Sequence, residues 1–453
     1  MIFADALPRI KTFLRPARLS TATTALLVRL IAAFLCHRGR LSASQAAVAI
    51  RSQARHRAQL TRFLARCHWS NNWAVLADVA DLLLRQEARH AGTGAFLLDQ
   101  TYVGQQGAKT ENTFSRANYR KRPKKGHRKN KKHAKRSCHG FVCGLLRTPS
   151  GLRIPCGRSS YTEGYCQDKK RAYRTQVQLA TELIAALAVP PDAEVVVLGD
   201  TAFEAQEIRV ACAARGWAWV MPLNPERVLA GAKPRPKVLS LVGTLSADRF
   251  EAVRLVPGQG PLAAQRRAAR CRLGPQAKTR TYYVPAEKHA VHNVGNVQLV
   301  FSTKEKPQAG EPVRVQKVLM TNAVTRTATQ VVQWYDLRWQ IELFFKELKS
   351  TLGMHRYRFR QFTKVENWVQ ACLVAFVYLE WYRACQLARS DLAEERRRWW
   401  RWQRSYGLSL AVSQAAEDED LSQLYRLART PSGQRKLRRR LREALPREYR
   451  PAG

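Results

Sequence analysis

Residues 194–200 read Glu-Val-Val-Val-Leu-Gly-Asp, an unbroken apolar run that ends in a glycine and an acid. Such a run without polar alternation is typical of a strand that is buried on both faces of a sheet. Asp200 would follow the carboxyl end of this strand. A second run, residues 95–98, leads in the same way into Asp99. The sequence therefore predicts two central strands that each deliver a carboxylate to polar chemistry at one edge of a sheet.

The segments around these runs predict an α/β layout. Residues 140–147 and 153–157 are typical of a hairpin, residues 171–189 and 204–215 of helices, and residues 217–223 and 316–322 of strands. Residues 224–316 are rich in Pro, Gly, Val, Tyr and basic side chains, and short apolar runs there indicate a β-rich insertion. One long helix is expected over residues 328–352. The fold class is thus a mixed-sheet α/β core that carries its acids at strand ends.

The charge of the chain points to a polyanionic partner. Lys and Arg number 78 against 34 Asp and Glu, a net charge of +44 in 453 residues. Nucleic acid is the expected partner, because basic residues occur along most of the chain rather than on one amphipathic helix that would suit a membrane. Residues 118–136 hold eleven Lys or Arg and no acid, a loop that can order on phosphates. Its candidate DNA contacts are Lys121, Arg122, Lys124 and Lys125.

The expected late helix places four polar residues on one face. Tyr335, Arg338, Glu342 and Lys349 fall within a wedge of roughly 60° at about 100° per residue. A carboxylate flanked by a guanidinium, a phenol and an ammonium suits a divalent metal beside a phosphodiester. Glu342 would bind the metal and the other three would hold phosphates.

Simpler interpretations exist for each of these acids. Arg338 and Glu342 are also an ordinary i,i+4 pair on a solvated helix, and Asp99 and Asp200 could each cap the next turn or helix. The joint occurrence favours a site: two strand-end acids and a third on a late helix, in a strongly basic chain, form one coherent metal centre on a nucleic-acid-binding protein.

The spacing Tyr335-x2-Arg338-x3-Glu342-x6-Lys349 resembles the YREK signature of DDE transposases of the IS-four group of bacterial insertion sequences. Asp99-Gln-Thr-Tyr is similar to the first-acid segment of that family, and the residues from Val196 to Phe203 resemble the second. The resemblance covers residues 95–353 in the expected order. Trp339 matches an aromatic position of the family next to Arg338, and would contact DNA.

The resemblance implies an RNase H-like core and Mg²⁺-dependent cleavage of transposon ends, followed by joining of the 3′-hydroxyls to target DNA. Asp99 would bridge two Mg²⁺ ions, for which Mn²⁺ may substitute, and Asp200 and Glu342 would each hold one. The partners would be terminal inverted repeats and target DNA, bound by a homodimer in the bacterial cytoplasm at the nucleoid, with no membrane and no small-molecule substrate. The implied organisation is a helical DNA-binding region at residues 1–90, the RNase H-like core at 91–223 and 317–360, a β-rich insertion at 224–316, and a helical C-terminal region for dimerisation or DNA contact at 361–453.

One departure from the family leaves a hairpin intermediate open. Related enzymes use a Trp within the insertion to hold a flipped base, whereas this chain has no Trp between Trp219 and Trp334. Tyr282 or Tyr283 could stack on a base instead, or could be ordinary strand packing.

Two other functions are compatible with parts of the pattern. An RNase H-like nuclease without strand transfer would share the acids, and a domesticated DNA-binding relative would keep the charge but lose an acid. All three acids are present, which argues against the relative. A zinc site of His139, Cys143, Cys156 and Cys166 is disfavoured because the chain contains no CxxC pair.

Overall fold

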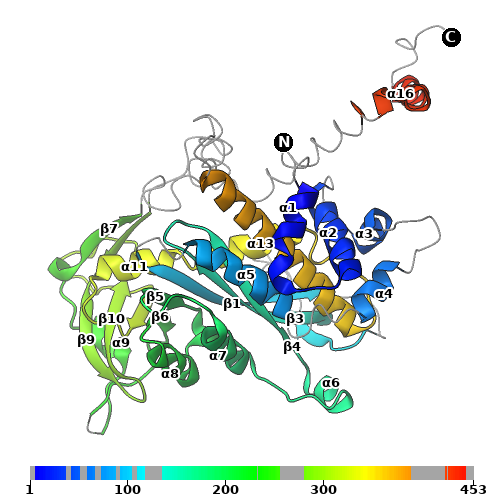
Figure 1. The fold of residues 1–453 in the computed structure, drawn as a ribbon. Coiled ribbons are helices and arrows are strands. Elements are labelled where there is room, and N and C mark those ends of the chain that lie inside the picture. Colours follow the sequence, from blue (N-terminus) through cyan, green and yellow to red (C-terminus); the bar gives the residue numbers. More distant parts are fainter. Residues whose placement is uncertain are drawn as a thin grey trace, which may run out of the picture.

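The computed structural model of the chain describes residues 6–36, 42–50, 59–66, 73–87, 92–104, 110–117, 135–231, 233–255, 280–388, 424–425 and 427–444. A mixed sheet lies at its centre, with helices from both ends of the chain packed around it (Figure 1). The α/β class predicted from the sequence, with a mixed sheet and flanking helices, is confirmed.

In the described part of the chain the sheet has nine strands. Its order is β2-β3-β1-β5-β6-β11-β10-β9, and β4 pairs with β3. The central strands β1 (Gly94–Gly104), β5 (Val195–Leu198) and β6 (Ala218–Leu223) are parallel, whereas β3 and β11 run antiparallel to their central neighbours. The remaining strands of the sheet are β2 (Phe114–Ala117), β3 (Lys135–Arg147), β4 (Arg153–Ser160), β9 (Ala286–Val291), β10 (Gly295–Ser302) and β11 (Lys317–Thr321).

The predicted central strands are buried for the reason expected. All four residues of β5 are buried, because helices cover the sheet on both sides. In Figure 1 the sheet passes between α7 (Gln176–Ala186) and α8 (Gln206–Ala214) on one side and α11 (Ala328–Asp336) and α13 (Phe362–Ala388) on the other. The hairpin of β3 and β4 is also as predicted.

The N-terminal helices gather around α13. That helix contacts α2, α4 and α5 as well as strand β4, and its residues 368–379 include a long run of buried side chains. Helix α13 is therefore a core helix, buried over most of its length. The N-terminal elements are α1 (Ala6–Phe13), η1 (Arg15–Ala17), α2 (Thr21–Cys36), α3 (Ala43–Ile50), α4 (Gln59–Arg66) and α5 (Ala74–Glu87).

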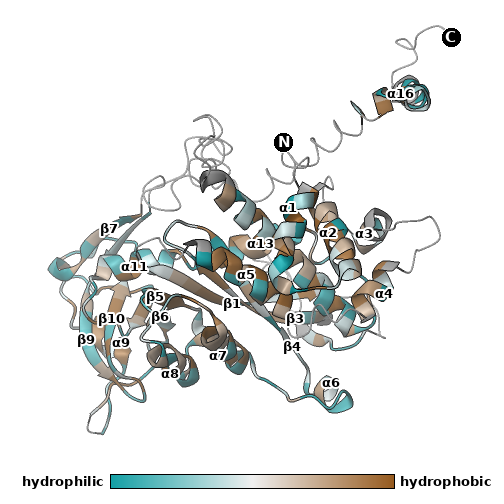
Figure 2. Ribbon diagram, viewed as in Figure 1, coloured by the Kyte–Doolittle hydropathy of each residue, from teal (hydrophilic) through white to brown (hydrophobic). Residues whose placement is uncertain are grey.

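The basic C-terminal segment forms α16 (Pro431–Ala444). This helix is mostly hydrophilic in Figure 2, in contrast to the apolar central strands. The Arg- and Trp-rich stretch over residues 396–404, for which DNA contact or subunit pairing was expected, lies outside the described residues.

Two features differ from the sequence-based expectation. The single helix expected over residues 328–352 is two helices, α11 and α12 (Trp339–Ser350), separated by a turn at Leu337 and Arg338. Hydrogen bonds from Gln340 to Leu337 and from Ile341 to Arg338 tighten this turn to a three-residue spacing. Within residues 224–316, strands β9 and β10 join the main sheet beside β11, whereas β7 (Glu251–Leu255) and β8 (Arg280–Val284) form a separate ribbon.

Short helical elements also connect the described strands and helices. They are α6 (Glu163–Asp168), η3 (Thr201–Phe203), α9 (Val238–Val242) and η4 (Ala247–Arg249). The helix expected over residues 171–189 begins only at Gln176, because the Thr175 side chain and Gln178 form a capping box there.

Candidate active site

The pairing of β1 with β5 sets Asp99 beside Asp200. Asp200 follows the end of β5 as expected, but the expectation that Asp99 ends its strand is wrong, because β1 continues to Gly104 in its pairing with β3. In this parallel pair Leu97 lies opposite Leu198, so Asp99 and Asp200 each stand two residues beyond the same rung. Gly199 makes the turn between β5 and Asp200, where a Cβ atom would meet the Met221 sulfur at 2.8 Å. A larger residue at this position would have to displace the side chains of Met221 and Phe203, whose Cβ atom would lie 2.9 Å away.

The third acid reaches the same place from α12, which packs against β1. Arg338 joins it to the first acid: its guanidinium lies 2.7 Å from the Glu342 carboxylate and 3.8 Å from that of Asp99. The guanidinium thus lies between the carboxylates of Asp99 and Glu342, and Asp200 follows the strand that pairs with β1.

The pKa of Asp99 is affected by the neighbouring charges. Burial raises the pKa of Asp99 to about 6, while a hydrogen bond from the Gln100 N–H opposes the shift. The negative charges of Asp200 and Glu342 contribute to this raised pKa, and Arg338 opposes it. Like charges that disfavour one another's ionisation are a common feature of sites that bind a cation.

Tyr335 lies beside the same acids. Burial raises the pKa of its phenol, Arg338 opposes the shift, and the charges of Asp200 and Glu342 add to it. The phenol therefore remains a protonated hydrogen-bond donor at neutral pH.

Lys349 is directed at the strand that carries Asp99. Its Nζ atom donates hydrogen bonds to Thr101 Oγ1 at 2.6 Å and to the Tyr102 carbonyl at 3.1 Å. Burial lowers the pKa of this ammonium, whereas the nearby thiol of Cys143 and the carboxylate of Asp99 raise it. The lysine thus ties α12 to β1 directly below the acids.

Two of the residues around the acids were not predicted. Lys317, at the start of β11, places its ammonium 4.8 Å from the centre of the Tyr335 ring, and its pKa is lowered by burial and by Arg338. Nothing in the sequence singles out this lysine. Thr101 could have been found, because it stands two residues after Asp99 and side chains alternate along a strand with a period of two.

The other predicted contacts divide into described and undescribed residues. Trp339 is described, and 54% of its surface is exposed beside Arg338. Tyr282 and Tyr283 of β8 are partly buried and pack against the core. Lys121, Arg122, Lys124 and Lys125 lie outside the described residues.

The donor chemistry of the site fits a hard divalent cation, because carboxylate oxygens are the ligands such ions prefer. Among the described residues, no three His, Cys, Asp or Glu side chains stand close enough together to form a ready-made metal cluster. Here the Arg338 guanidinium bridges Asp99 and Glu342 as a cation. A metal ion would take over the role of that charge.

Comparison with known proteins identifies the core. Residues 90–378 match the family model of the transposase DDE domain, a span that includes all three acids and more than half of the 453 residues. With this match, the mixed sheet and its flanking helices are an RNase H-like core, as the sequence predicted. No curated protein gives a significant match to the chain. Within the described residues, none of the helices has the length and apolar character needed to cross a membrane.

Proposed function

The chain belongs to the transposase DDE domain family, and from this premise we propose that it cleaves transposon ends and joins the 3′-hydroxyls to target DNA. The observation that carries the proposal is geometric: the pairing of β1 with β5 sets Asp99 beside Asp200, and Arg338 links Asp99 to Glu342. Acids gathered in this way can hold a divalent cation, and the substrate of a DDE enzyme is the polyanion that the net charge of +44 predicts.

Asp99, Asp200 and Glu342 would hold two Mg²⁺ ions, with Mn²⁺ as a substitute and Asp99 shared between them. Such ions supply activation of water or of a 3′-hydroxyl and stabilisation of the leaving oxygen. Family membership implies divalent-metal chemistry, and the hard oxygen donors favour Mg²⁺.

Arg338 would change partners when the site is loaded. Its guanidinium neutralises Asp99 and Glu342 in the present structure. Once those carboxylates bind metal, the guanidinium is released to hold a phosphate, which its planar fork of donors suits. Tyr335, protonated at neutral pH, would donate its O–H to the same strand.

The remaining phosphate and base contacts are proposed on the same basis. Lys349 uses two of its three N–H groups on Thr101 and Tyr102, which leaves one for a phosphate. Trp339 has an exposed face that suits stacking on a base. Lys121, Arg122, Lys124 and Lys125 would follow the backbone by charge alone. The YREK spacing supports the proposal that the chain belongs to the IS-four group.

The wider assembly is also part of the proposal. Residues 1–90 would bind DNA, residues 224–316 would act as the insertion, and residues 361–453 would serve dimerisation or DNA contact around the core at 91–223 and 317–360. A homodimer would pair two inverted repeats in a cut-and-paste reaction at the bacterial nucleoid.

A strand-transfer assay with candidate terminal inverted repeats and Mg²⁺ tests the proposal. Asp99→Asn, Asp200→Asn and Glu342→Gln should each abolish cleavage while DNA binding in a mobility-shift assay stays largely intact. Loss of binding in step with cleavage would mean that the acids are structural. Cleavage without joining would favour a nuclease, and binding without cleavage by the unaltered protein would favour a domesticated DNA-binding relative.

A further inference from the structure

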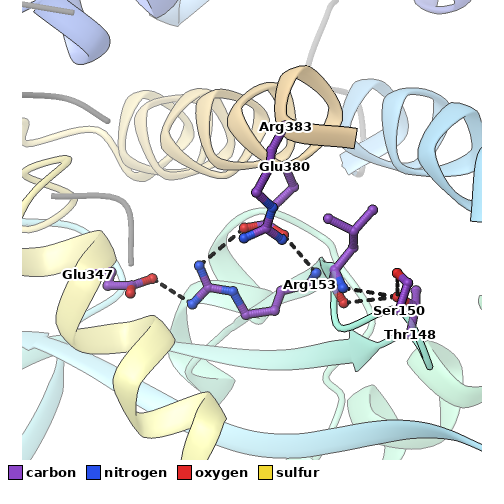
Figure 3. A network of polar contacts seen from close by, with 7 residues as sticks. Thr148, Ser150, Arg153, Glu347, Glu380 and Arg383 are labelled. Carbon is purple, nitrogen blue, oxygen red and sulfur yellow. Dashed lines mark hydrogen bonds and ion pairs between the residues drawn. The ribbon is translucent and has the colours of Figure 1, made fainter. Parts of the chain in front are cut away.

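A buried group of charges lies on the side of α12 away from the acid site. We call this group, formed by Arg153, Glu347, Glu380 and Arg383, the anchor network (Figure 3). Glu347 follows Glu342 by five residues, which is about 140° around a helix. Its Oε2 atom lies 2.8 Å from an Arg153 guanidinium nitrogen. The helix that carries Glu342 is thus held from behind.

Arg153 is the centre of the network. It begins β4, and its side chain is 5% exposed. The second guanidinium nitrogen lies 3.1 Å from Glu380 Oε1, and the Arg153 backbone N–H donates to Glu380 Oε2 at 2.9 Å. The guanidinium also lies 5.0 Å from the centre of the Phe376 ring. Arg383 completes the network by pairing with Glu380.

The charges balance, with two arginines against two glutamates. Burial lowers the pKa of Arg153, but the two glutamates more than offset this effect, so its pKa is raised. Buried ion pairs are often no more stable than well-packed apolar side chains of the same size. Such a pair instead fixes the relative orientation of the elements that carry it, because the guanidinium donates its hydrogen bonds to carboxylates only in fixed directions.

The opposite side of α12 is fixed independently by Lys349, which donates to Thr101 and to the Tyr102 carbonyl on β1. Lys349 lies two residues after Glu347, about 200° around the helix. The helix is therefore held between β1, which carries Asp99, and the pair formed by β4 and α13. These contacts place α12 by themselves, because the turn at Leu337 and Arg338 separates it from α11.

We propose that the anchor network is a positioning device that sets the place of Glu342 relative to Asp99. This inference rests on the proposed function, because the distance between these acids matters only if they share a metal site. Arg153, Glu347 and Glu380 touch no substrate; they act through α12. A displacement of about 1 Å in such a constellation can lower a rate by about 100-fold.

The test compares Glu347→Gln with Ile184→Ala. Ile184 is fully buried in α7 and lies outside the network, so its truncation lowers stability without altering the anchor. Glu347→Gln should lower the cleavage kcat by about ten- to 100-fold and raise the Mn²⁺ concentration for half-maximal binding measured by EPR, with little change in DNA affinity. Ile184→Ala, assayed well below its melting temperature, should retain kcat and Mn²⁺ affinity. A wild-type kcat for Glu347→Gln, or equal losses in both variants, would overturn the proposal.

Two further arms separate this inference from the proposed function. In a double-mutant cycle, Arg153→Gln should add little to the kcat loss of Glu347→Gln, because both remove the pair between Arg153 and Glu347, the contact of the network with α12; additive losses would contradict the network. Amide hydrogen exchange over residues 339–350 needs neither metal nor cleavage, and should be faster in Glu347→Gln than in Ile184→Ala. Equal exchange rates in the two variants would contradict the positioning role of the anchor network, even if the unaltered protein cleaves DNA. An unaltered protein that neither binds Mn²⁺ nor cleaves DNA would contradict the proposed function.

Discussion

The two sides of α12 use the same chemistry for opposite purposes. On the acid side, Arg338 and Glu342 approach to 2.7 Å, lie four residues apart at the start of α12, and are 18% and 34% exposed. On the anchor side, Arg153 and Glu347 approach to 2.8 Å, come from different elements, and are 5% and 16% exposed. A half-open pair at the start of a helix can exchange its cation for a metal or its anion for a phosphate. A closed pair between elements cannot, and it fixes position instead.

Exchanging the two glutamates for glutamine gives the largest expected contrast. Glu342→Gln should lower cleavage on the order of 10³-fold, since a metal ligand contributes several kcal/mol to transition-state stabilisation. Its unfolding free energy should change by no more than about 0.5 kcal/mol, as for other surface substitutions. Glu347→Gln should reverse the order, with the smaller rate loss and the larger loss of stability. Single-turnover cleavage measures the rate loss, and urea unfolding measures the loss of stability. Equal losses of rate and of stability in the two variants would contradict the division between the acid side and the anchor side of α12.

Removing the cation from each side tests stability directly. Arg153→Met leaves Glu347 buried without its partner, and should lower the unfolding free energy by about 3–5 kcal/mol in a urea titration. Arg338→Met, the matched control on the acid side, should lower it by less than about 1 kcal/mol, because an exposed i,i+4 pair contributes little. Similar losses in both would mean that the acid-side pair is also structural.

His139 is a buried group like those of the anchor network, and its burial should make the stability of the protein depend on pH. Its ring nitrogens lie 3.0 Å from the Tyr357 hydroxyl and 3.0 Å from the Glu111 carbonyl, and burial lowers its pKa to about 4. The unfolded chain binds the proton with a pKa near 6.5. The stabilisation is therefore complete above about pH 6.5 and is lost as the pH falls toward 4, by about 3 kcal/mol in all.

Unfolding titrations at several pH values, compared between the unaltered chain and His139→Gln, would measure this effect. The difference between the two curves isolates the imidazole from the many carboxylates that titrate in the same range. Parallel curves would show that folding does not shift the pKa of His139 and would refute the assignment.

Features that depend on short stretches of the chain could be predicted from the sequence. The run that forms β5 is apolar throughout, Asp99 and Asp200 each follow such a run, and Glu342 lies in a segment predicted to be helical, so elements and candidate acids could be predicted together. Strand β9 could not, because its residues Ala-Glu-Lys-His-Ala-Val lie at the sheet edge, where no apolar run is needed.

Features that depend on distant partners had no local signal. The break between α11 and α12 contains neither glycine nor proline, so nothing in residues 337–338 marks it. Arg153 and Glu347 are 194 residues apart, and each resembles an ordinary surface charge until β4 and α12 are placed. The same limit explains why Lys349, predicted only as a phosphate contact, also holds Thr101.

The smallest expected effect concerns Arg338. It tells whether this arginine competes with a metal ion for Asp99 and Glu342 or serves only as a DNA contact. In the metal-free protein its guanidinium shares Asp99 and Glu342 with any incoming cation. Arg338→Ala should therefore tighten Mn²⁺ binding to the DNA-free protein by a few-fold, while it weakens DNA binding and reduces the salt dependence by about one phosphate contact. Arg338→Lys keeps the charge and should leave the salt dependence nearly unchanged. Weaker Mn²⁺ binding in Arg338→Ala would mean that the arginine assembles the acids rather than competing for them, and the acid side would then resemble the anchor side.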